Sequence, residues 1–413
     1  MKKKFKIDNV GKIYTRVSSE KNPNIFRISI NLTEKVKAHV LKRAANDIMP
    51  RFPTFKTKAR AGVFWEYLVY NKLEVEVYPI NDNEGIYNNL AKKNNRYLFR
   101  ISSRGKSINL DVHHSLSDGY GGLTFLQSLV YRYLTLCGKD LKPDADVKTA
   151  DQKPTAEELE DSLTTYYDRR NSKSSTAGRA FHIKGKPLPQ GISVTRIKWR
   201  AEQLLQLTRK TKTTVTEYLA ALLACSIYKS QLAGKEGGEN LPIRICISYD
   251  LRRAFKSQTL KNFSNYLKTN HIFTETTSFE DVLAEAKRQI NLENNPYFLI
   301  RRANSTVKFE RNFFINLVPF FIKSPVMKYI YKKMSNEVIT TSFSNLGVIK
   351  FSESIKDYIS DCEVNLFTSG FSTCAVTYNG VTQMSFNKTI EETDIEKIFI
   401  QHLVEQGVEV QVL

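Results

Sequence analysis

The sequence predicts an α+β fold with two lobes, each a mixed β-sheet packed with helices. The chain has 413 residues, more than one hydrophobic core usually holds. Strand-like and helix-like segments are mixed in both halves, without the strict alternation of a doubly wound sheet. Between residues 138 and 190 the chain becomes polar and rich in small residues, which is typical of a connection between lobes. We therefore expect a first lobe at 1–178, with its crossover at about 139–178, and a second lobe at 179–413.

The first lobe is predicted from alternation and helical spacing. Apolar residues alternate along two segments around a short turn, as in a hairpin, and then recur at helical spacing until a glycine ends the pattern. The expected elements are a helix at 33–48, strands at 97–101 and 107–112, a helix from Gly121 to Gly138, and a helix at 156–169 inside the crossover.

The second lobe is predicted in the same way. Thr214 and Glu217 have the spacing of a capping box and mark the start of a helix. Turn residues divide the segment 363–386 into three short strands. The expected elements are a strand at 193–199, a helix at 214–229, a strand at 241–249, the three strands of 363–386, a helix at 391–405 and a last short strand.

Composition excludes several classes of protein. A hydrophobic content of 41% with 24 Phe is enough for a packed interior and excludes wholesale disorder. Five scattered cysteines without Cys-x-x-Cys spacing indicate reduced, buried thiols in a cytoplasmic protein. No apolar segment follows the basic start, and the longest apolar run, 313–322, is too short to span a bilayer. Phosphate-loop, dinucleotide and metal-site patterns are absent, so we expect no metal and no permanently bound cofactor.

The most informative motif lies between the predicted hairpin and the helix that follows it. Residues 113–119 read HHSLSDG, a strand-loop-helix corner that can hold a side chain rigidly and present it to a cleft. A neutral histidine suits proton transfer, because its ordinary pKa lies near working pH.

On this motif the sequence resembles the acyl-CoA-dependent acyltransferase superfamily. The superfamily includes chloramphenicol acetyltransferase, the plant acyltransferases, the condensation domains of peptide synthetases and the bacterial alcohol acetyltransferases. Its His-His-x-x-x-Asp-Gly signature is complete here, and the similarity to the alcohol acetyltransferase branch spans most of the chain. The short segments that follow that branch in order are 55–65, 251–252, 261–263 and 344–347. The Asp-Phe-Gly-Trp-Gly loop of the plant branch is absent.

The resemblance implies a fold and an activity. Two chloramphenicol acetyltransferase-like lobes would enclose an active-site tunnel. An acyl group, expected to be acetyl, would pass from acyl-CoA to a hydroxyl acceptor by direct attack, with His114 as general base and His113 in a minor role. A thioester is already activated, and the sequence has no Gly-x-Ser-x-Gly elbow for a covalent intermediate.

The resemblance also assigns the rest of the motif. Asp118 and Gly119 would order the loop, with Asp118 in a buried salt bridge to an arginine of the second lobe. Arg252 occupies the matching place, and Arg253 is the alternative partner. A buried aspartate is costly unless it is paired, so this pair would hold the two lobes in register.

Two further sets of residues are candidates with open alternatives. Ser344 and Asn345 offer donors for an oxyanion or for the tunnel wall, or else they are turn residues at a strand end. Arg209, Lys210 and Lys212 precede the capped helix and are candidates for coenzyme A phosphates, or else they form a solvated helix end.

The formal net charge of +20 indicates acidic partners or serves solubility. We expect a monomer that uses acyl-CoA and a small alcohol or amine acceptor, with a carrier protein as a further partner and no nucleic acid. The basic, aromatic segment 311–333 makes peripheral membrane contact an alternative. A condensation-type enzyme with carrier-bound acyl groups or an amine acceptor is the second functional hypothesis. An inactive scaffold that binds an anionic surface or nucleic acid is the third, and the intact His114 and Asp118 weigh against it.

Overall fold

The computed structural model describes residues 4–19, 22–79, 94–171, 178–189, 191–234, 241–311 and 317–413. Within these ranges the strands form three sheets, two of which carry the large hydrophobic cores. One sheet has five strands in the order β12-β2-β7-β6-β5, and another has seven in the order β10-β9-β11-β13-β14-β8-β15. The predicted α+β fold with mixed sheets is confirmed.

The five-stranded sheet carries the first core. Its strands are β2 (Ile25–Leu32), β5 (Val77–Pro79), β6 (Phe99–Arg104), β7 (Ser107–His113) and β12 (Ile359–Phe367). Helix α2 (Ala38–Ile48), which continues into the 3-10 turn η1 (Met49–Arg51), packs on helix α4 (Gly119–Leu136). The predicted hairpin is present as β6 and β7, which pair antiparallel around Gly105 at a φ of 55°. Helix α4 ends before Gly138, whose φ of 89° favours glycine.

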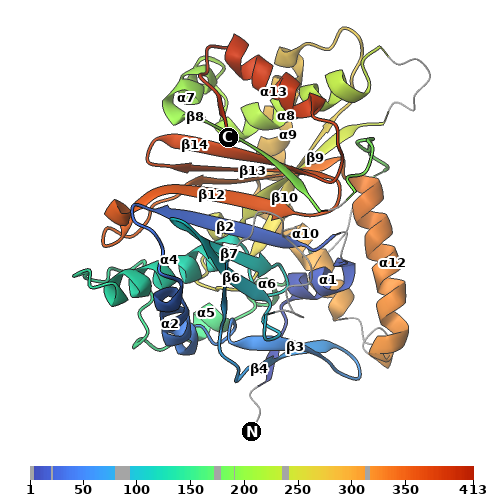
Figure 1. Cartoon of the computed structure of the whole chain (residues 1–413). Helices are drawn as coiled ribbons and strands as arrows, with labels where there is room; N and C mark the ends of the chain where they lie inside the picture. The colour runs from blue at the N-terminus through green and yellow to red at the C-terminus, as the bar shows by residue number, and fades with distance from the viewer. Residues whose placement is uncertain are drawn as a thin grey trace.

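The seven-stranded sheet carries the second core and occupies the upper half of the molecule in Figure 1. Its strands are β8 (Ser193–Arg200), β9 (Ile243–Asp250), β10 (Ser264–His271), β11 (Thr341–Val348), β13 (Phe371–Tyr378), β14 (Val381–Lys388) and β15 (Gln411–Val412). Its helices are α7 (Ala201–Lys210), α8 (Val215–Gln231), α9 (Phe279–Glu293) and α13 (Asp394–Glu405), and the 3-10 turn η2 (Leu251–Arg253) follows β9. The predicted capping box is confirmed, because Thr214 and Glu217 bond reciprocally at the start of α8.

One strand crosses between the lobes. Strand β12 pairs along its length with β2 of the first sheet, from Ile359 opposite Leu32 to Phe367 opposite Ile25. The 3-10 turn η3 (Lys356–Tyr358) leads into β12. The three strands predicted at 363–386 exist as β12, β13 and β14, but only β13 and β14 belong to the second sheet. Chain from beyond residue 179 thus completes the first sheet, and the division into lobes at 178 stays a prediction.

The crossover contains two short helices where the sequence predicted one. They are α5 (Ala156–Leu159) and α6 (Ser162–Thr165). The backbone carbonyls of Glu158 and Glu160 accept hydrogen bonds from Leu260 N–H and the Thr259 hydroxyl, at 3.0 and 2.7 Å. These bonds hold the segment against Thr259 and Leu260, and the backbone is extended at Glu160 between the two helices, so the prediction of a single helix at 156–169 is wrong.

A side layer flanks both sheets. It consists of β1 (Lys4–Lys6), β3 (Thr57–Ala61) and β4 (Glu66–Tyr70), with helices α1 (Asn9–Val17), α10 (Pro296–Glu310) and α12 (Phe320–Val338). Helix α12 stands at the right-hand edge of Figure 1 and contacts α1. Helix α1 begins at Asp8, whose Oδ1 accepts a hydrogen bond from Gly11 N–H at 2.6 Å.

Three chemical features of the described ranges bear on the class of protein. All five cysteines carry free thiols, four of them buried. No group of three or more metal-ligating side chains comes together in these parts of the chain. No helix there has both the length and the apolar character needed to cross a bilayer.

Candidate active site

His114 lies in the loop between β7 and α4, with its ring held between two aromatic side chains. Tyr14 of α1 stacks on the imidazole with ring centroids 4.6 Å apart and planes 21° apart. Phe26 of β2 contacts it with centroids 4.8 Å apart. The backbone is fixed as well, because His114 N–H donates to the carbonyl of Asn24 at 3.0 Å. The ring is therefore held in a defined orientation before any ligand binds.

Burial keeps the His114 imidazole neutral. It lowers the pKa of His114 to about 4, while Asp118 and Asn262 oppose the shift. Nδ1 of His114 and Oδ1 of Asn262 are both buried, and neither has a hydrogen-bond partner among the described residues. At neutral pH the ring is therefore unprotonated, which is the state that a general base requires.

Asn262 ties helix α1 to the histidine loop. Its side-chain amide donates to the His114 carbonyl at 2.8 Å and to Oδ2 of Asp8 at 3.0 Å. Its backbone N–H donates to the same carboxylate at 3.3 Å. Because Asp8 also caps α1, one buried network connects α1, the loop and the segment before β10.

His113 has both ring nitrogens occupied. Nδ1 accepts a hydrogen bond from Ser115 N–H at 3.1 Å, which places the ring proton on Nε2. Nε2 lies 2.9 Å from the Ser18 hydroxyl at the end of α1, and Nδ1 lies 2.6 Å from the Ser115 hydroxyl. Burial lowers the pKa of His113 to about 4, and His114 adds to the effect. These contacts give His113 a structural place within the loop.

Asp118 joins the loop to the second lobe through Arg252. Nη1 of Arg252 lies 2.9 Å from Oδ2 of Asp118, and both side chains are buried. Asp118 also accepts hydrogen bonds from Phe263 N–H at 2.8 Å and from Gly121 N–H at 3.2 Å, so it caps α4. Burial alone would lower the pKa of Arg252, but the carboxylates of Asp118 and Asp250 raise it. The residue that meets Asp118 is thus Arg252 rather than Arg253.

The glycines of this corner differ in their steric role. A Cβ on Gly121 would collide with the Leu260 carbonyl and the Ser117 hydroxyl. A Cβ on Gly119 would meet only the side chain of Leu346, at 3.9 Å. The close approach between the lobes therefore requires glycine at position 121, whereas the space at 119 would admit a larger residue.

Ser344 and Asn345 point to opposite faces of β11. Leu346 packs against the first core, near the start of α4. Ser344 pairs with Cys374 of β13, which belongs to the first core, so the two side chains share that face of the sheet. Asn345 instead donates to the Thr216 hydroxyl at 3.1 Å, in the first turn of α8. Of the two predicted oxyanion donors, Ser344 therefore lies on the face toward the first core and Asn345 on the face toward α8.

The basic run before α8 has the contacts of a solvated helix end. Arg209 pairs with Glu202 at 2.9 Å on the surface, and Lys212 accepts a hydrogen bond from the Lys287 ammonium through its carbonyl at 2.7 Å. Lys210, in the same turn, is exposed. The N-terminus of α8 already holds a carboxylate, since Glu217 accepts a bond from Thr214 N–H at 2.7 Å. Binding of coenzyme A by Arg209, Lys210 and Lys212 stays a prediction.

No protein-family model matches the sequence, and no curated protein matches it. Solved structures, in contrast, match the chain over nearly its whole length. TRI101 of F. graminearum, complexed with coenzyme A and deoxynivalenol, superposes with a TM-score of 0.63 at 10% identity and covers 99% of both chains. Polyketide synthase associated protein 5 from Mycobacterium tuberculosis gives 0.63 at 12% identity, over 97% of this chain and 96% of that one. The first condensation domain of the CDA synthetase gives 0.61 at 11% identity, over 98% and 96%.

This chain has the chloramphenicol acetyltransferase-like fold. The match extends over nearly its whole length, so both lobes and their arrangement correspond to those of acetyltransferases and condensation domains. The resemblance inferred from the motif is thereby confirmed for the fold.

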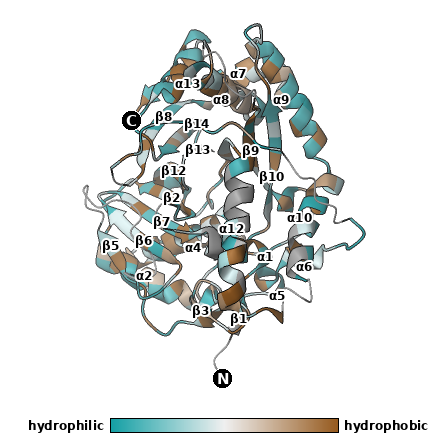
Figure 2. Ribbon diagram, turned by 90° about the vertical axis from the view of Figure 1, so that its right-hand side faces the viewer, coloured by the Kyte–Doolittle hydropathy of each residue, from teal (hydrophilic) through white to brown (hydrophobic). Residues whose placement is uncertain are grey.

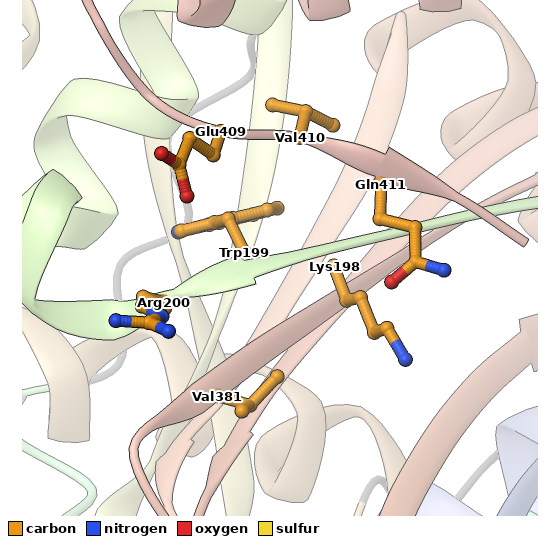
Figure 3. A pocket seen from close by; sticks show the side chains of 7 residues that line it. All are labelled: Lys198, Trp199, Arg200, Val381, Glu409, Val410 and Gln411. Carbon is orange, nitrogen blue, oxygen red and sulfur yellow. The ribbon is translucent and has the colours of Figure 1, made fainter.

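Two hollows of this chloramphenicol acetyltransferase-like fold lie away from the motif. A surface hollow of about 310 Å³ opens between β8 and β15, at the outer edge of the second sheet. Figure 3 shows its lining: Lys198, Trp199, Arg200, Val381, Glu409, Val410 and Gln411. A second hollow of about 60 Å³ lies where α2 begins and α4 ends, beside Tyr133 and Tyr358. The tunnel between the lobes stays a prediction.

Sequence reasoning missed four residues of the site: Asp8, Tyr14, Phe26 and Asn262. Asn262 lies in a segment that carried the resemblance, but nothing local marks its contact with a histidine 148 positions away. Asp8 stands 254 positions from Asn262. Such contacts arise only when the fold brings the N-terminal helix between the lobes.

Asp8 gives a testable dependence of stability on pH. Burial raises the pKa of Asp8 to about 7, and Asp161 adds to the shift. The folded state then keeps a proton that the unfolded state releases at about pH 4, so the unfolding free energy should fall as pH rises from about 4 to 7. Asp8→Asn, neutral at every pH, should have a smaller fall, measured by chemical denaturation across this range. An equal fall of the unfolding free energy with pH in the two proteins would contradict the claim that Asp8 is buried and protonated.

Proposed function

We propose that this protein transfers an acyl group from acyl-CoA to a hydroxyl acceptor, with His114 as general base. The observation that carries the proposal is a neutral imidazole, clamped between Tyr14 and Phe26, in a loop that Asp118 and Arg252 lock to the second lobe. The fold supports it, because proteins of this fold include the TRI3 trichothecene 15-O-acetyltransferase. The donor is suggested by TRI101 and by a starter condensation domain, whose structures hold coenzyme A and C8-CoA.

One histidine can carry both proton transfers of the reaction. Nε2 of His114 takes the proton of the acceptor hydroxyl while the oxygen attacks the thioester carbonyl. The tetrahedral intermediate then expels the thiolate, the carbon–sulfur bond breaks, and the imidazolium returns its proton to sulfur. Because burial lowers the pKa of His114 to about 4, the imidazolium is a strong acid and protonates the leaving thiolate readily. No acyl-enzyme is needed. Acetyl is the acyl group that we expect.

The oxyanion of this intermediate needs a preorganised donor. Ser344 is our candidate, because it pairs with Cys374 of β13 and so lies on the face of the second sheet that meets the first core. We do not assign this role to Asn345, because its side-chain amide donates to the Thr216 hydroxyl.

We assign Asn262 a positioning role. Its unpaired Oδ1 and the unpaired Nδ1 of His114 complement each other as acceptor and donor. A bond between them would keep the ring proton on Nδ1 and leave Nε2 free to act as base.

Asn262→Ala should lower kcat about tenfold, the typical worth of one buried hydrogen bond, with little change in KM for acyl-CoA. Steady-state kinetics would give the split between kcat and KM. Nitrogen NMR of the His114 ring should show a shift in tautomer for the variant and not for wild type. A variant with a lower melting temperature but unchanged kcat and tautomer would make Asn262 structural only.

The function is tested by a screen of purified protein. Acyl-CoAs of increasing chain length are combined with a panel of alcohols and amines, and free thiol release is measured together with the mass of the product. We expect thiol release that depends on an alcohol and yields its ester. Consumption of an acylated carrier protein but of no acyl-CoA would favour a condensation-type enzyme. No turnover with any donor would contradict an enzymatic role.

A further inference from the structure

Large apolar side chains gather on one exposed face of the side layer. We call this the apolar face; it consists of Val63 and Phe64 in the β3–β4 turn, Leu317 just before α12, and Phe321 and Ile322 in its first turn. Each is between 43% and 76% exposed. The two segments are joined, because Phe320 N–H donates to the Val63 carbonyl at 2.7 Å. The lower end of α12 is coloured hydrophobic in Figure 2, next to β3 and β1.

Helix α12 extends this face along one side. Ile322, Val326 and Tyr329 follow one another at intervals of four and three residues, so they share a stripe of the helix. Val326 and Tyr329 are also exposed. Single exposed apolar residues are ordinary on a protein surface, but several large ones on two segments that are joined to each other are typical of a surface that another apolar phase covers.

The charges around the apolar face indicate what covers it. Arg60 of β3 and Lys328 of α12 are exposed beside it. The sequence of α12 contains four lysines and one glutamate, and the whole chain carries a formal charge of +20. Helices that lie in a lipid interface combine Phe, Leu and Ile on one side with lysine on the other. Anionic headgroups attract such bases.

We propose that the apolar face docks on the surface of a bilayer that contains anionic phospholipid. Phe321, Ile322 and Val63 enter the boundary between headgroups and acyl chains, while Lys328 and Arg60 meet the lipid phosphates. The helix lies on the surface and does not span it, in keeping with its lysines. The proposal concerns where the protein works and is independent of its acyl donor and acceptor.

The test is co-sedimentation of the full chain with vesicles of phosphatidylcholine, either alone or mixed with phosphatidylglycerol. Wild type should sediment with the mixed vesicles at low salt and be released as salt rises. Phe321→Asp should weaken this binding at least tenfold. Lys328→Glu should weaken it about fivefold or more, since each base near an anionic surface contributes about 1 kcal/mol.

Val404→Asp and Leu292→Asp are matched controls, because both residues are about half exposed but lie on α13 and α9. Both controls should bind vesicles as wild type does. Wild type that stays in solution with both vesicle types would overturn the proposal, as would Phe321→Asp binding like the controls. A wild-type dimer in light scattering that Phe321→Asp converts to a monomer would overturn it in favour of a second copy of the chain.

Discussion

Replacing His114 with alanine is expected to lower kcat by about 10² to 10⁴-fold, the usual contribution of general base catalysis. The imidazole is neutral, its ring is fixed by Tyr14 and Phe26, and the motif offers no second free base. The measurement is steady-state turnover of the best donor and acceptor pair from the screen, together with the melting temperature. The variant should stay folded with a moderate loss of melting temperature from the lost ring packing, because the His114 backbone and the Asp118–Arg252 pair still hold the loop.

His113→Ala is the matched control. Its ring bonds to Ser18 and Ser115, so the substitution should lower stability and reduce turnover less than His114→Ala does. The reverse order of the two losses would exchange the roles of the histidines. A His114→Ala protein that kept most of the wild-type rate would remove the base from the proposed mechanism.

Asp118→Asn is expected to destabilise the protein by about 3 to 5 kcal/mol, because it leaves the Arg252 guanidinium buried without its full counter-charge. Arg252→Met should cost a similar amount by stranding Asp118. The double variant should be less damaged than the sum of the two, by at least about 1 kcal/mol, since the residues are in direct contact. Chemical denaturation of the four proteins measures this coupling.

The exposed pair Arg288 and Glu285 provides the comparison for this cycle. Its atoms are 2.7 Å apart, but the side chains are largely in solvent, so its coupling should be about 0 to 1 kcal/mol. Strict additivity at Asp118 and Arg252 would mean that the ion pair does not hold the lobes together. Activity loss in Asp118→Asn should follow from the displaced loop.

Local patterns predicted those parts of the fold that local forces determine. Alternation and Gly105 predicted the β6–β7 hairpin, and the Thr214–Glu217 box predicted the start of α8. Local patterns failed where a distant segment competes for backbone groups. Thr259 and Leu260 interrupt the crossover helix, and β12 leaves its sequence neighbours to pair with β2.

The residues of the candidate site also fall into those that the local sequence located and those that it did not. The corner that carries His114 is continuous in sequence, so the motif located it. The partner of Asp118 was expected only through the resemblance, which placed Arg252 134 positions away. Tyr14 and Asn262 carry no local signal, because their contacts with His114 depend on how the N-terminal helix enters the space between the lobes.

Rapid-quench transfer of label from acyl-labelled acyl-CoA tests the central claim most directly. In wild type the label should pass to the hydroxyl acceptor as an ester and should never be found on the protein, with or without acceptor. In His114→Ala, ester formation should fall by about 10² to 10⁴-fold at saturating donor. Label bound covalently to the protein, or ester formed at the wild-type rate by His114→Ala, would contradict direct attack with His114 as the base.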